Sequence, residues 1–455
     1  MNYHHIHFIG IGGIGMSGIA QIVLRNGIKV SGSDLKETSI TSKLMGIGAQ
    51  VFIGHSCENV RGADLVVFSS AIKEENPEFM EARRLNIPLV RRAEILAKLM
   101  ADKTVIAVTG SHGKTTTTSL AACLLIEAGF SPTAAIGGIL KGFDTNAYIG
   151  DGKFFVAEAD ESDGSFLCYN PKYSIITNID REHLDYYKNF ENEVHAFKSF
   201  IDRTQDGGCI FCCGDDINLR RILKGYKNKY LLFGMNDGCD IYADNILMKE
   251  LGSEFDCYYK SKLLGRFKLS LSGRHNISNS LGVIGLGMEL GLSFNTMKSA
   301  LFSCHGSARR MEVKFRSKDF TLVDDYAHHP TEIRATLNAA KNMISNRIIA
   351  VFQPHRYTRT KLLLNDFASC FDMADGVIIT DIYAASESPL EGVSAQAVCE
   401  KIKDNSPEKY LRYVPKMDLI PQIMESIKPG DLIITLGAGD ITRVCDGLAK
   451  ELALR

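Results

Sequence analysis

Short apolar runs rich in β-branched residues alternate with helical stretches along this chain, a pattern typical of parallel α/β layers. The first segment predicts a strand over 4–9, a glycine-rich loop over 10–15, a helix near 16–25 and a second strand over 28–31. Residues 88–102 read as a closing strand, a short helix and a linker.

Two later segments restart the same pattern. A predicted strand over 104–108 runs directly into a second glycine loop over 109–115. The third segment begins near residue 311 and has strand-like runs at 320–323, 348–352 and 376–380. A chain of 455 residues is too long for one ordinary core, so we expect two to four domains.

Charge and hydropathy exclude several classes of protein. The 52 basic and 53 acidic residues balance, and no polybasic run indicates nucleic acid or a membrane surface. No apolar stretch reaches the ~18–20 residues that span a bilayer, and the N-terminus lacks the pattern of a signal peptide. We expect substrates to be held by local sites.

The twelve cysteines are scattered singly, apart from Cys209, Cys212 and Cys213. Their CxxC spacing is compatible with zinc, but no second ligand pair lies nearby, so a buried strand is the favoured interpretation. We expect reduced thiols and a cytoplasmic location.

The first glycine loop contains GxGxxG at Gly10, Gly12 and Gly15. Between a strand and a helix, such glycines let backbone amides approach a diphosphate at the helix N-terminus. Asp34, after the second strand, suits a ribose hydroxyl. Alone, this pattern is most often an NAD or FAD site, and a turn without a ligand is the structural alternative.

The second loop, Gly113-Lys114-Thr115, ends like a P-loop, although Val108 stands where the full pattern has glycine. In such loops backbone N–H groups cradle phosphates. Lys114 would neutralise the β- and γ-phosphate oxygens and the Thr115 hydroxyl would bind Mg²⁺. The loop predicts ATP binding.

Carboxylates gather after the next predicted strand, over 156–163, and another polar group over 177–185 includes His183. Mg²⁺ prefers carboxylate, hydroxyl and water oxygens. Asp163 and Glu182 are equally compatible with a solvated loop, and His183 alone with a structural histidine. Glu158 directly ends an apolar strand and is the stronger candidate.

Several motifs in order along nearly the whole chain resemble the Mur ligases, and among them the members that add L-alanine. The motifs occupy residues 7–18, 109–118, 157–166, 177–185, 273–279, 324–332 and 353–360. The resemblance implies three α/β domains. We place a Rossmann-like UDP-sugar domain at 1–98, a central P-loop-type ATPase domain with a mainly parallel sheet at 99–310, and a Rossmann-like amino-acid domain at 311–455.

The resemblance also implies roles for individual residues. Glu158, His183 and Thr115 would hold the metal, Mg²⁺ or Mn²⁺, and the catalytic set would be Lys114, Glu158, His183, His328 and His355. The UDP-sugar would contact Gly10, Gly12, Gly13, Ile14, Gly15, Asp34 and Ser69. ATP would contact Gly110, Ser111, His112, Gly113, Lys114, Thr115, Thr116, His275, Asn276 and Asn279. The amino acid would contact Tyr326, His355, Arg356 and Arg359.

The last assignment has support from the residues themselves. Arg356 and Arg359 are three apart, so they share a face if the segment is helical, and two guanidinium groups can clamp a small carboxylate. A basic surface turn is the alternative. His328 and His329 point apart if extended, which favours substrate contacts or structural roles over a metal pair.

Three positions depart from the family or invite comparison with it. Ser111 stands where threonine is usual, and Gly282 where we expect alanine. Lys198 follows His183 at a spacing that invites comparison with the carbamylated lysine of some sister ligases, which alanine-adding members generally lack.

The implied function is ATP-dependent joining of L-alanine to the carboxylate of UDP-N-acetylmuramate through an acyl phosphate, in peptidoglycan precursor synthesis. We expect domain closure, a monomer or weak homodimer, and no nucleic-acid or membrane partner. The alternatives are a recycling ligase that adds a peptide to the same sugar, an NAD-dependent oxidoreductase, and a P-loop ATPase switch.

Overall fold

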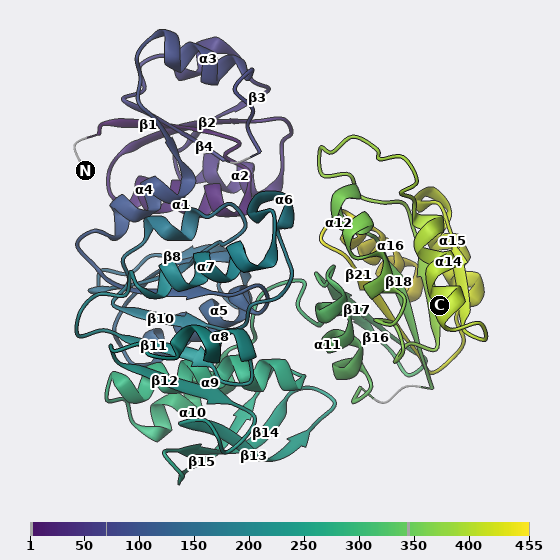
Figure 1. Ribbon diagram of the computed structural model, residues 1–455. Coiled ribbons are helices and arrows are strands. Elements are labelled where there is room, and N and C mark those ends of the chain that lie inside the picture. Colours follow the sequence, from purple (N-terminus) through teal and green to yellow (C-terminus); the bar gives the residue numbers. More distant parts are fainter. Residues whose placement is uncertain (1–2, 70, 344–345, 455) are drawn as a thin grey trace. The chain divides into compact units, whose positions relative to one another are not determined.

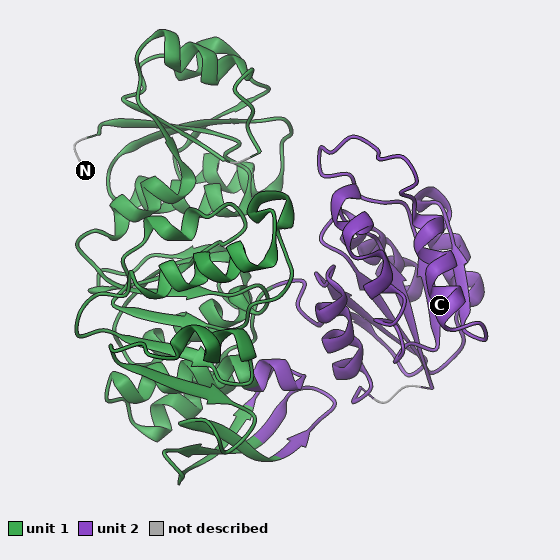
Figure 2. Ribbon diagram, viewed as in Figure 1, with its two compact units in different colours: residues 1–245, 255–268, 278–307 green, residues 246–254, 269–277, 308–455 purple. Residues whose placement is uncertain are grey.

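The computed structural model describes residues 3–69, 71–343 and 346–454. The chain folds into two compact units (Figure 2): residues 1–245, 255–268 and 278–307 form unit 1, and residues 246–254, 269–277 and 308–455 form unit 2. The backbone forms three separate sheets, so the three-domain α/β class is confirmed. Over the described residues, none of the helices has the length and apolarity needed to cross a membrane.

The first sheet is parallel and has the order β3-β2-β1-β4-β5 (Figure 1). β1 is buried along its whole length and lies where the strand order reverses. The loop after β1 therefore opens at the switch point, where ligands of such sheets bind. The elements are β1 (His5–Ile9), α1 (Ile14–Arg25), β2 (Lys29–Asp34), α2 (Ser39–Gly46), β3 (Gln50–Ile53), η1 (Cys57–Val60), β4 (Leu65–Phe68), α3 (Pro77–Arg84), β5 (Leu89–Arg91) and α4 (Arg92–Met100).

The central sheet has the order β15-β14-β13-β12-β11-β10-β6-β9-β7-β8. β6 pairs in parallel with β9 and β10, which again makes the loop after β6 a switch point. The strands are β6 (Thr104–Thr109), β7 (Thr133–Leu140), β8 (Thr145–Tyr148), β9 (Phe154–Glu158), β10 (Tyr173–Ile176), β11 (Cys209–Cys213), β12 (Tyr230–Gly234), β13 (Ile241–Met248), β14 (Ser253–Tyr259) and β15 (Lys262–Leu269).

Helices α5, α7 and α9 are the longest of this part. The helical elements are α5 (Lys114–Glu127), η2 (Ser165–Cys168), α6 (Leu184–Tyr187), α7 (Phe190–Ile201), α8 (Ile217–Leu223), α9 (Arg274–Glu289) and α10 (Phe294–Ser303). Cys209, Cys212 and Cys213 lie in the fully buried strand β11 as free thiols, so the buried-strand interpretation of the CxxC spacing is confirmed.

The third sheet has the order β16-β17-β21-β18-β19-β20, with β16 antiparallel and the others parallel. Apolar clusters cover both of its faces. The elements are β16 (Glu312–Arg316), β17 (Phe320–Asp325), α11 (Pro330–Ala340), β18 (Arg347–Phe352), α12 (Tyr357–Leu362), α13 (Leu364–Phe367), β19 (Gly376–Ile379), α14 (Ala395–Asn405), β20 (Tyr410–Tyr413), η3 (Lys416–Asp418), α15 (Leu419–Ser426), β21 (Asp431–Leu436) and α16 (Ile441–Ala453).

The first two sheets are joined by buried polar contacts within unit 1. Asn146 on β8 donates to the Ile14 carbonyl and, at 2.9 Å, to Ser17 Oγ on α1. Gln21 Nε2 returns a hydrogen bond to Asn146 Oδ1 at 3.0 Å. Buried amide groups satisfied in this way fix one helix against one strand. The glycine loop before α1 is therefore held in a defined position relative to the central sheet.

Candidate active site

The first glycine loop closes on Asp34, the last residue of β2. The Gly12 amide donates to Asp34 Oδ2 at 2.9 Å, and a Cβ at Gly12 would lie 2.8 Å from the same oxygen. Gly10 has φ +80°, which favours glycine, and Ser69 Oγ lies beside it. One oxygen of Asp34 thus supports the loop itself, a role that the sequence did not indicate.

The second loop needs glycine at both ends. Gly110 and Gly113 have φ values of +132° and +84°. The 177–178 segment after β10 clamps the turn, because Asn178 accepts from the amides of Ser111 at 3.0 Å and His112 at 2.9 Å. A Cβ at Gly113 would lie 2.7 Å from Asn279 Oδ1. Asn279 therefore borders the loop.

Lys114 begins α5 and folds back over this loop. Its Nζ donates to the carbonyls of Gly110 at 2.7 Å and Ser111 at 3.1 Å, and to Glu161 Oε1 at 2.7 Å. Burial would lower the pKa of Lys114, but Glu161 and Asp160 raise it above its usual value. The amine stays protonated and can stabilise phosphate oxygens at any physiological pH.

Thr115, in the first turn of α5, lies beside Glu158, the last residue of β9. Thr115 Oγ1 donates to Glu158 Oε1 at 3.1 Å, and the Gly137 amide donates to Oε2 at 2.9 Å. Burial raises the pKa of Glu158, although Lys114 partly offsets the effect. A carboxylate and a hydroxyl held together in this way form an oxygen donor set that suits Mg²⁺.

His183 approaches the same region from the loop before α6. Its Nε2 lies 3.6 Å from Glu161 Oε1 and 3.3 Å from Glu182 Oε2. Burial would lower the pKa of His183, but hydrogen bonding to the two carboxylates raises it to about 10. Glu182 is 6% exposed, so the solvated-loop alternative for Glu182 is wrong. Glu161 links His183 to Lys114, and sequence reasoning assigned it no role.

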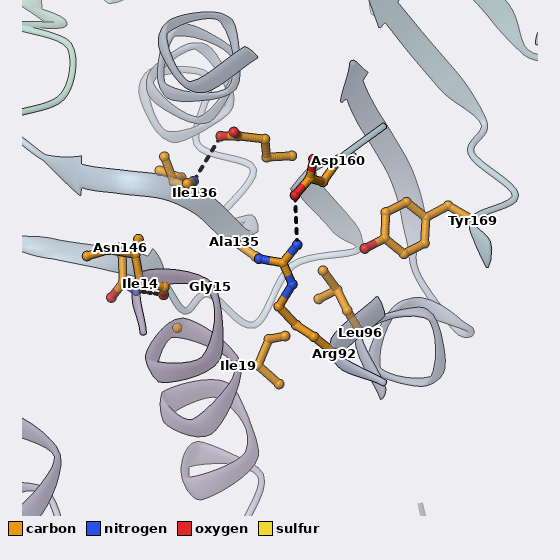
Figure 3. Close-up of a pocket in the computed structure, with 13 residues that line it drawn as sticks. Ile14, Gly15, Ile19, Arg92, Leu96, Ala135, Ile136, Asn146, Asp160 and Tyr169 are labelled. Carbon is orange, nitrogen blue, oxygen red and sulfur yellow. Dashed lines mark hydrogen bonds and ion pairs between the residues drawn. The ribbon is translucent and has the colours of Figure 1, made fainter. Parts of the chain in front are cut away.

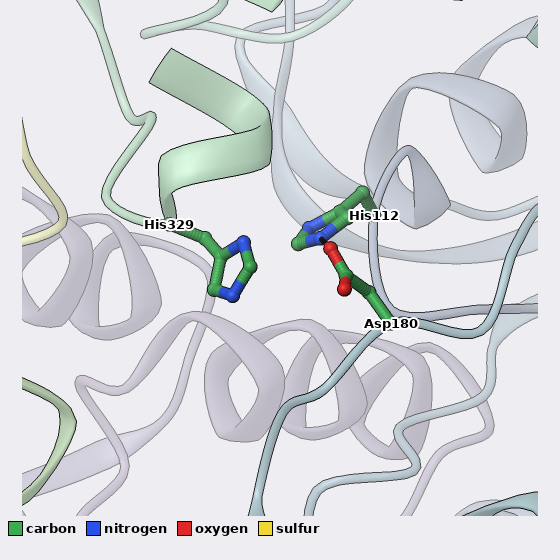
Figure 4. Close-up of side chains that lie close together, drawn as sticks. All are labelled: His112, Asp180 and His329. Carbon is green, nitrogen blue, oxygen red and sulfur yellow. Dashed lines mark hydrogen bonds and ion pairs between the residues drawn. The ribbon is translucent and has the colours of Figure 1, made fainter. Parts of the chain in front are cut away.

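His112 pairs with Asp180 rather than pointing into solvent. Its Nε2 lies 2.8 Å from Asp180 Oδ2, and Figure 4 shows the imidazole facing that carboxylate. Asp180 in turn donates its backbone amide to Ser111 Oγ at 2.8 Å. The P-loop and the segment after β10 are therefore joined by side chains as well as by backbone.

His275 and Asn276 lie in unit 2, at the start of α9. Burial is the main cause that lowers the pKa of His275, to about 4, so its imidazole is neutral at physiological pH. Asn276 Nδ2 donates to the Ser272 carbonyl at 2.8 Å. Lys198 on α7 is exposed.

The residues expected at the amino-acid site gather at the carboxyl ends of β17 and β18 within unit 2. The Tyr326 and His328 rings are 5.5 Å apart, and the His328 and His355 rings are 5.7 Å apart. Arg359 Nη1 lies 3.0 Å from His355 Nδ1. His329 is the N-cap residue of α11, with its Nδ1 accepting from the Thr331 amide at 3.3 Å, a structural role.

The expectation that Arg356 and Arg359 share a helix face is wrong. Helix α12 begins at Tyr357, and Arg356 precedes it with φ +69° and ψ 137°. Arg356 Nε donates to Glu387 Oε1 at 2.5 Å, and the same carboxylate accepts from Thr358. The left-handed turn at Arg356 is imposed by the chain around it, which the i,i+3 spacing could not reveal.

A small pocket opens between α1, α4 and the central sheet within unit 1, with a volume of about 60 Å³ (Figure 3). Gly15 and Gly18 line one side and Glu158 and Asp160 another, with Arg92 among them. Arg92 Nη2 donates to Asp160 Oδ2 at 3.0 Å. Sequence reasoning missed Arg92, although its position directly after a strand was visible.

Models of the family match three successive parts of the chain. The "Mur ligase family, catalytic domain" matches residues 5–104, the "Mur ligase middle domain" residues 108–287, and the "Mur ligase, glutamate ligase domain" residues 309–439. The three matches follow the three sheets in order.

Similar proteins match along almost the whole length. The UDP-N-acetylmuramate–L-alanine ligase of Desulfotalea psychrophila is 46% identical and covers 98% of this chain and 99% of its own. That of Syntrophus aciditrophicus is also 46% identical, covering 98% and 93%. The crystal structure of the UDP-N-acetylmuramate–alanine ligase of Thermotoga maritima has a TM-score of 0.85 at 30% identity, covering 99% of each chain. Because relatives that are 46% identical align with 98% of this chain, the chain belongs to the Mur ligase family.

Proposed function

We propose that this protein is an ATP-dependent ligase that joins L-alanine to the carboxylate of UDP-N-acetylmuramate, an early step of peptidoglycan precursor synthesis. Two relatives at 46% identity carry that activity in their names. The substrates are UDP-N-acetylmuramate, L-alanine and ATP. We keep the division into domains at 1–98, 99–310 and 311–455 as part of the proposal.

One observation carries the proposal. The diphosphate-type loop before α1 and the P-loop before α5 both belong to unit 1, and Glu158 lines a pocket whose other wall is α1. A dehydrogenase needs the first loop alone, and an ATPase switch needs the second alone. A ligase that activates a UDP-sugar with ATP needs both at a fixed separation.

Thr115, Glu158 and His183 would hold the divalent cation. Their donors are a hydroxyl, a carboxylate and an imidazole, and the first two already lie 3.1 Å apart. When bound, Mg²⁺ neutralises charge on the phosphate oxygens. Mn²⁺ suits the same donor set, since imidazole and carboxylate both bind it.

The chemistry begins with a poor acyl donor. The acceptor carboxylate attacks the γ-phosphorus of ATP, the bond to the β-phosphate oxygen breaks, and an acyl phosphate and ADP form. Lys114 stabilises the charge that spreads over the phosphoryl oxygens. The neutral amine of alanine then attacks the acyl carbon, and phosphate leaves from the tetrahedral intermediate with one former carboxylate oxygen.

Unit 2 would supply the amino acid. Arg359 would bind the alanine carboxylate by a charge-assisted hydrogen bond, and Tyr326 and Arg356 would contact the amino acid beside it. His355 or His328 would accept the proton that the attacking amine loses. His275, Asn276 and Asn279 remain our proposed adenine-side contacts, and closure of unit 2 on unit 1 would bring the halves together.

Phosphate release tests the proposal directly. We expect release only when ATP, Mg²⁺, UDP-N-acetylmuramate and L-alanine are all present, with one phosphate per amide bond. Turnover with a tripeptide in place of alanine would instead indicate the recycling ligase. Oxidation or reduction of a nicotinamide cofactor, followed by absorbance, would indicate the oxidoreductase.

A further inference from the structure

Arg92, the first residue of α4, projects into the pocket between α1 and the central sheet (Figure 3). Its ion pair with Asp160 joins two residues 68 positions apart, one after β5 and one after β9. The Nη1 atom lies directly over Gly15, where any Cβ would collide with it. Glycine at position 15 leaves room for the guanidinium in this position.

The position of the pocket restricts what can enter it. One wall is the first turn of α1, which follows the glycine loop. Another is Glu158, which accepts a hydrogen bond from Thr115 of the P-loop. An acceptor that has its diphosphate at the glycine loop and reacts at the γ-phosphate must place its reacting end between these walls. A volume of about 60 Å³ has room for a carboxylate.

Within the pocket, an anionic group would be attracted to Arg92 and repelled by the two acidic residues. Of the thirteen lining residues, all within the described part of the chain, Arg92 is the basic one, whereas Glu158 and Asp160 are acidic. The hydrogen bond to Asp160 uses one of five guanidinium donors. A guanidinium can pair with two carboxylates, one at each of two edges. Because Nη2 binds Asp160 and Nη1 lies on the α1 side, Nη1 is the donor that faces an incoming carboxylate.

We propose that Arg92 binds the lactyl carboxylate of the UDP-sugar acceptor and that Asp160 is a positioning residue, which holds the guanidinium at the pocket before the acceptor arrives. This inference rests on the proposed function and deepens it. Arg92 thereby determines specificity, because it distinguishes the acceptor from nucleotide sugars that lack the carboxylate.

Calorimetric titration with two nucleotide sugars tests the assignment. UDP-N-acetylglucosamine has the same diphosphate and a similar ring but lacks the lactyl group. We expect the wild-type chain to prefer UDP-N-acetylmuramate. Arg92→Gln should weaken UDP-N-acetylmuramate binding about 10- to 100-fold and leave UDP-N-acetylglucosamine within about 2-fold, since one charged hydrogen bond is lost only with the first.

Asp160→Asn separates this role from a structural one. Both substitutions break the same ion pair, so a purely structural bridge predicts equal effects. Our proposal predicts that Asp160→Asn keeps the preference for UDP-N-acetylmuramate, because Arg92 remains. Arg92→Lys keeps the positive charge but lacks the planar guanidinium, so its preference for UDP-N-acetylmuramate should lie between those of the wild type and Arg92→Gln. This variant replaces Arg92→Gln in the test if Arg92→Gln does not fold. Arg84→Gln is the matched control, because it breaks the ion pair between exposed Arg84 and Glu81 on α3, away from the pocket.

Three results would overturn the inference: equal losses for both sugars in Arg92→Gln, equal effects of Arg92→Gln and Asp160→Asn, or no preference in the wild type. None of them affects the proposed function, which fails separately if the wild-type chain releases no phosphate in the presence of all three substrates.

Discussion

Glu161 joins Lys114 to His183. Its Oε1 accepts from Lys114 Nζ at 2.7 Å and lies 3.6 Å from His183 Nε2, while its side chain is fully buried. A buried carboxylate is stable only when paired, and removing one partner of such a pair costs about 3–5 kcal/mol. Glu161 therefore fixes the lysine of the P-loop and the histidine after β10 in one arrangement before any nucleotide is bound.

Replacing Lys114 should abolish ligation without abolishing acceptor binding. Loss of one electrostatic contact to the transition state costs about 100- to 1,000-fold in turnover, whereas the glycine loop before α1 is built from other residues. We expect Lys114→Ala to keep the UDP-N-acetylmuramate affinity in calorimetry, with exposed Lys227→Ala as the control. Loss of acceptor binding in a folded variant would contradict separate sites.

Glu158→Gln and His183→Ala should each raise the Mg²⁺ concentration needed for half-maximal turnover, by about tenfold or more for one lost charged ligand. The two side chains approach the P-loop from different strands, so the effects should appear independently. A Mg²⁺ titration of initial rate measures them, with exposed Asp151→Asn as the control. Near-normal Mg²⁺ dependence in both variants would remove these residues from the metal site.

Binding of Mg²⁺ should release a proton from His183. The pKa of His183 is about 10 because of Glu161 and Glu182, so the imidazole is protonated at pH 8, whereas a metal ligand must be neutral. Calorimetry in two buffers of different ionisation enthalpy should show about one proton released, fewer as the pH approaches 10, and none in His183→Ala. A buffer-independent enthalpy in the wild type would show that His183 does not bind the metal.

The first domain should lose stability in acid through Glu78. Burial alone would raise the pKa of Glu78, but the His7 imidazole, 3.7 Å away, and hydrogen bonds from Ser33 and Asn59 lower it to about 2. A folded pKa below the unfolded value stabilises the native state above about pH 4.5, and this contribution, about 3 kcal/mol, is lost as the pH falls towards 2.

Chemical denaturation between pH 7 and pH 3 measures this contribution of Glu78. Glu78→Gln should lower the free energy of unfolding at pH 7 and flatten its dependence on pH in the acid range. Exposed Glu75→Gln, just before the same helix, is the control. The same acid dependence in Glu78→Gln as in the wild type would show that another carboxylate is responsible.

Arg359→Ala should raise the KM for alanine about 10- to 100-fold, because a charged hydrogen bond to the carboxylate contributes about 1.5–3 kcal/mol. The KM values for ATP and UDP-N-acetylmuramate should change far less. Glycine should be a poor substrate, since a missing methyl costs about 1–3 kcal/mol, and alaninamide nearly inert. A defect confined to ATP would place Arg359 at the phosphates.

Local patterns predicted the elements that present the site. The strand before the P-loop was expected over 104–108 and is found at Thr104–Thr109, and Glu158 does end a buried strand. These features depend on neighbouring residues, whose apolar runs and glycines are visible in the sequence. The strand expected over 28–31 continues to Asp34, because residues 31–33 are buried although small or polar.

Interactions between distant segments could not be predicted in the same way. Arg92 and Asp160 meet because α4 packs against the segment that follows β9, and that packing depends on the positions of two whole sheets. The turn at Arg356 depends likewise on Glu387, 31 residues later. Each of these residues alone reads as an ordinary surface charge.

Transfer of an oxygen isotope tests the central claim most directly. If the acceptor carboxylate attacks the γ-phosphorus and the amine of alanine then displaces phosphate, one carboxylate oxygen must leave with that phosphate. UDP-N-acetylmuramate labelled with ¹⁸O in both carboxylate oxygens should yield one ¹⁸O in each phosphate released, measured by mass spectrometry and dependent on alanine. Phosphate without the label would contradict activation of the acceptor by ATP.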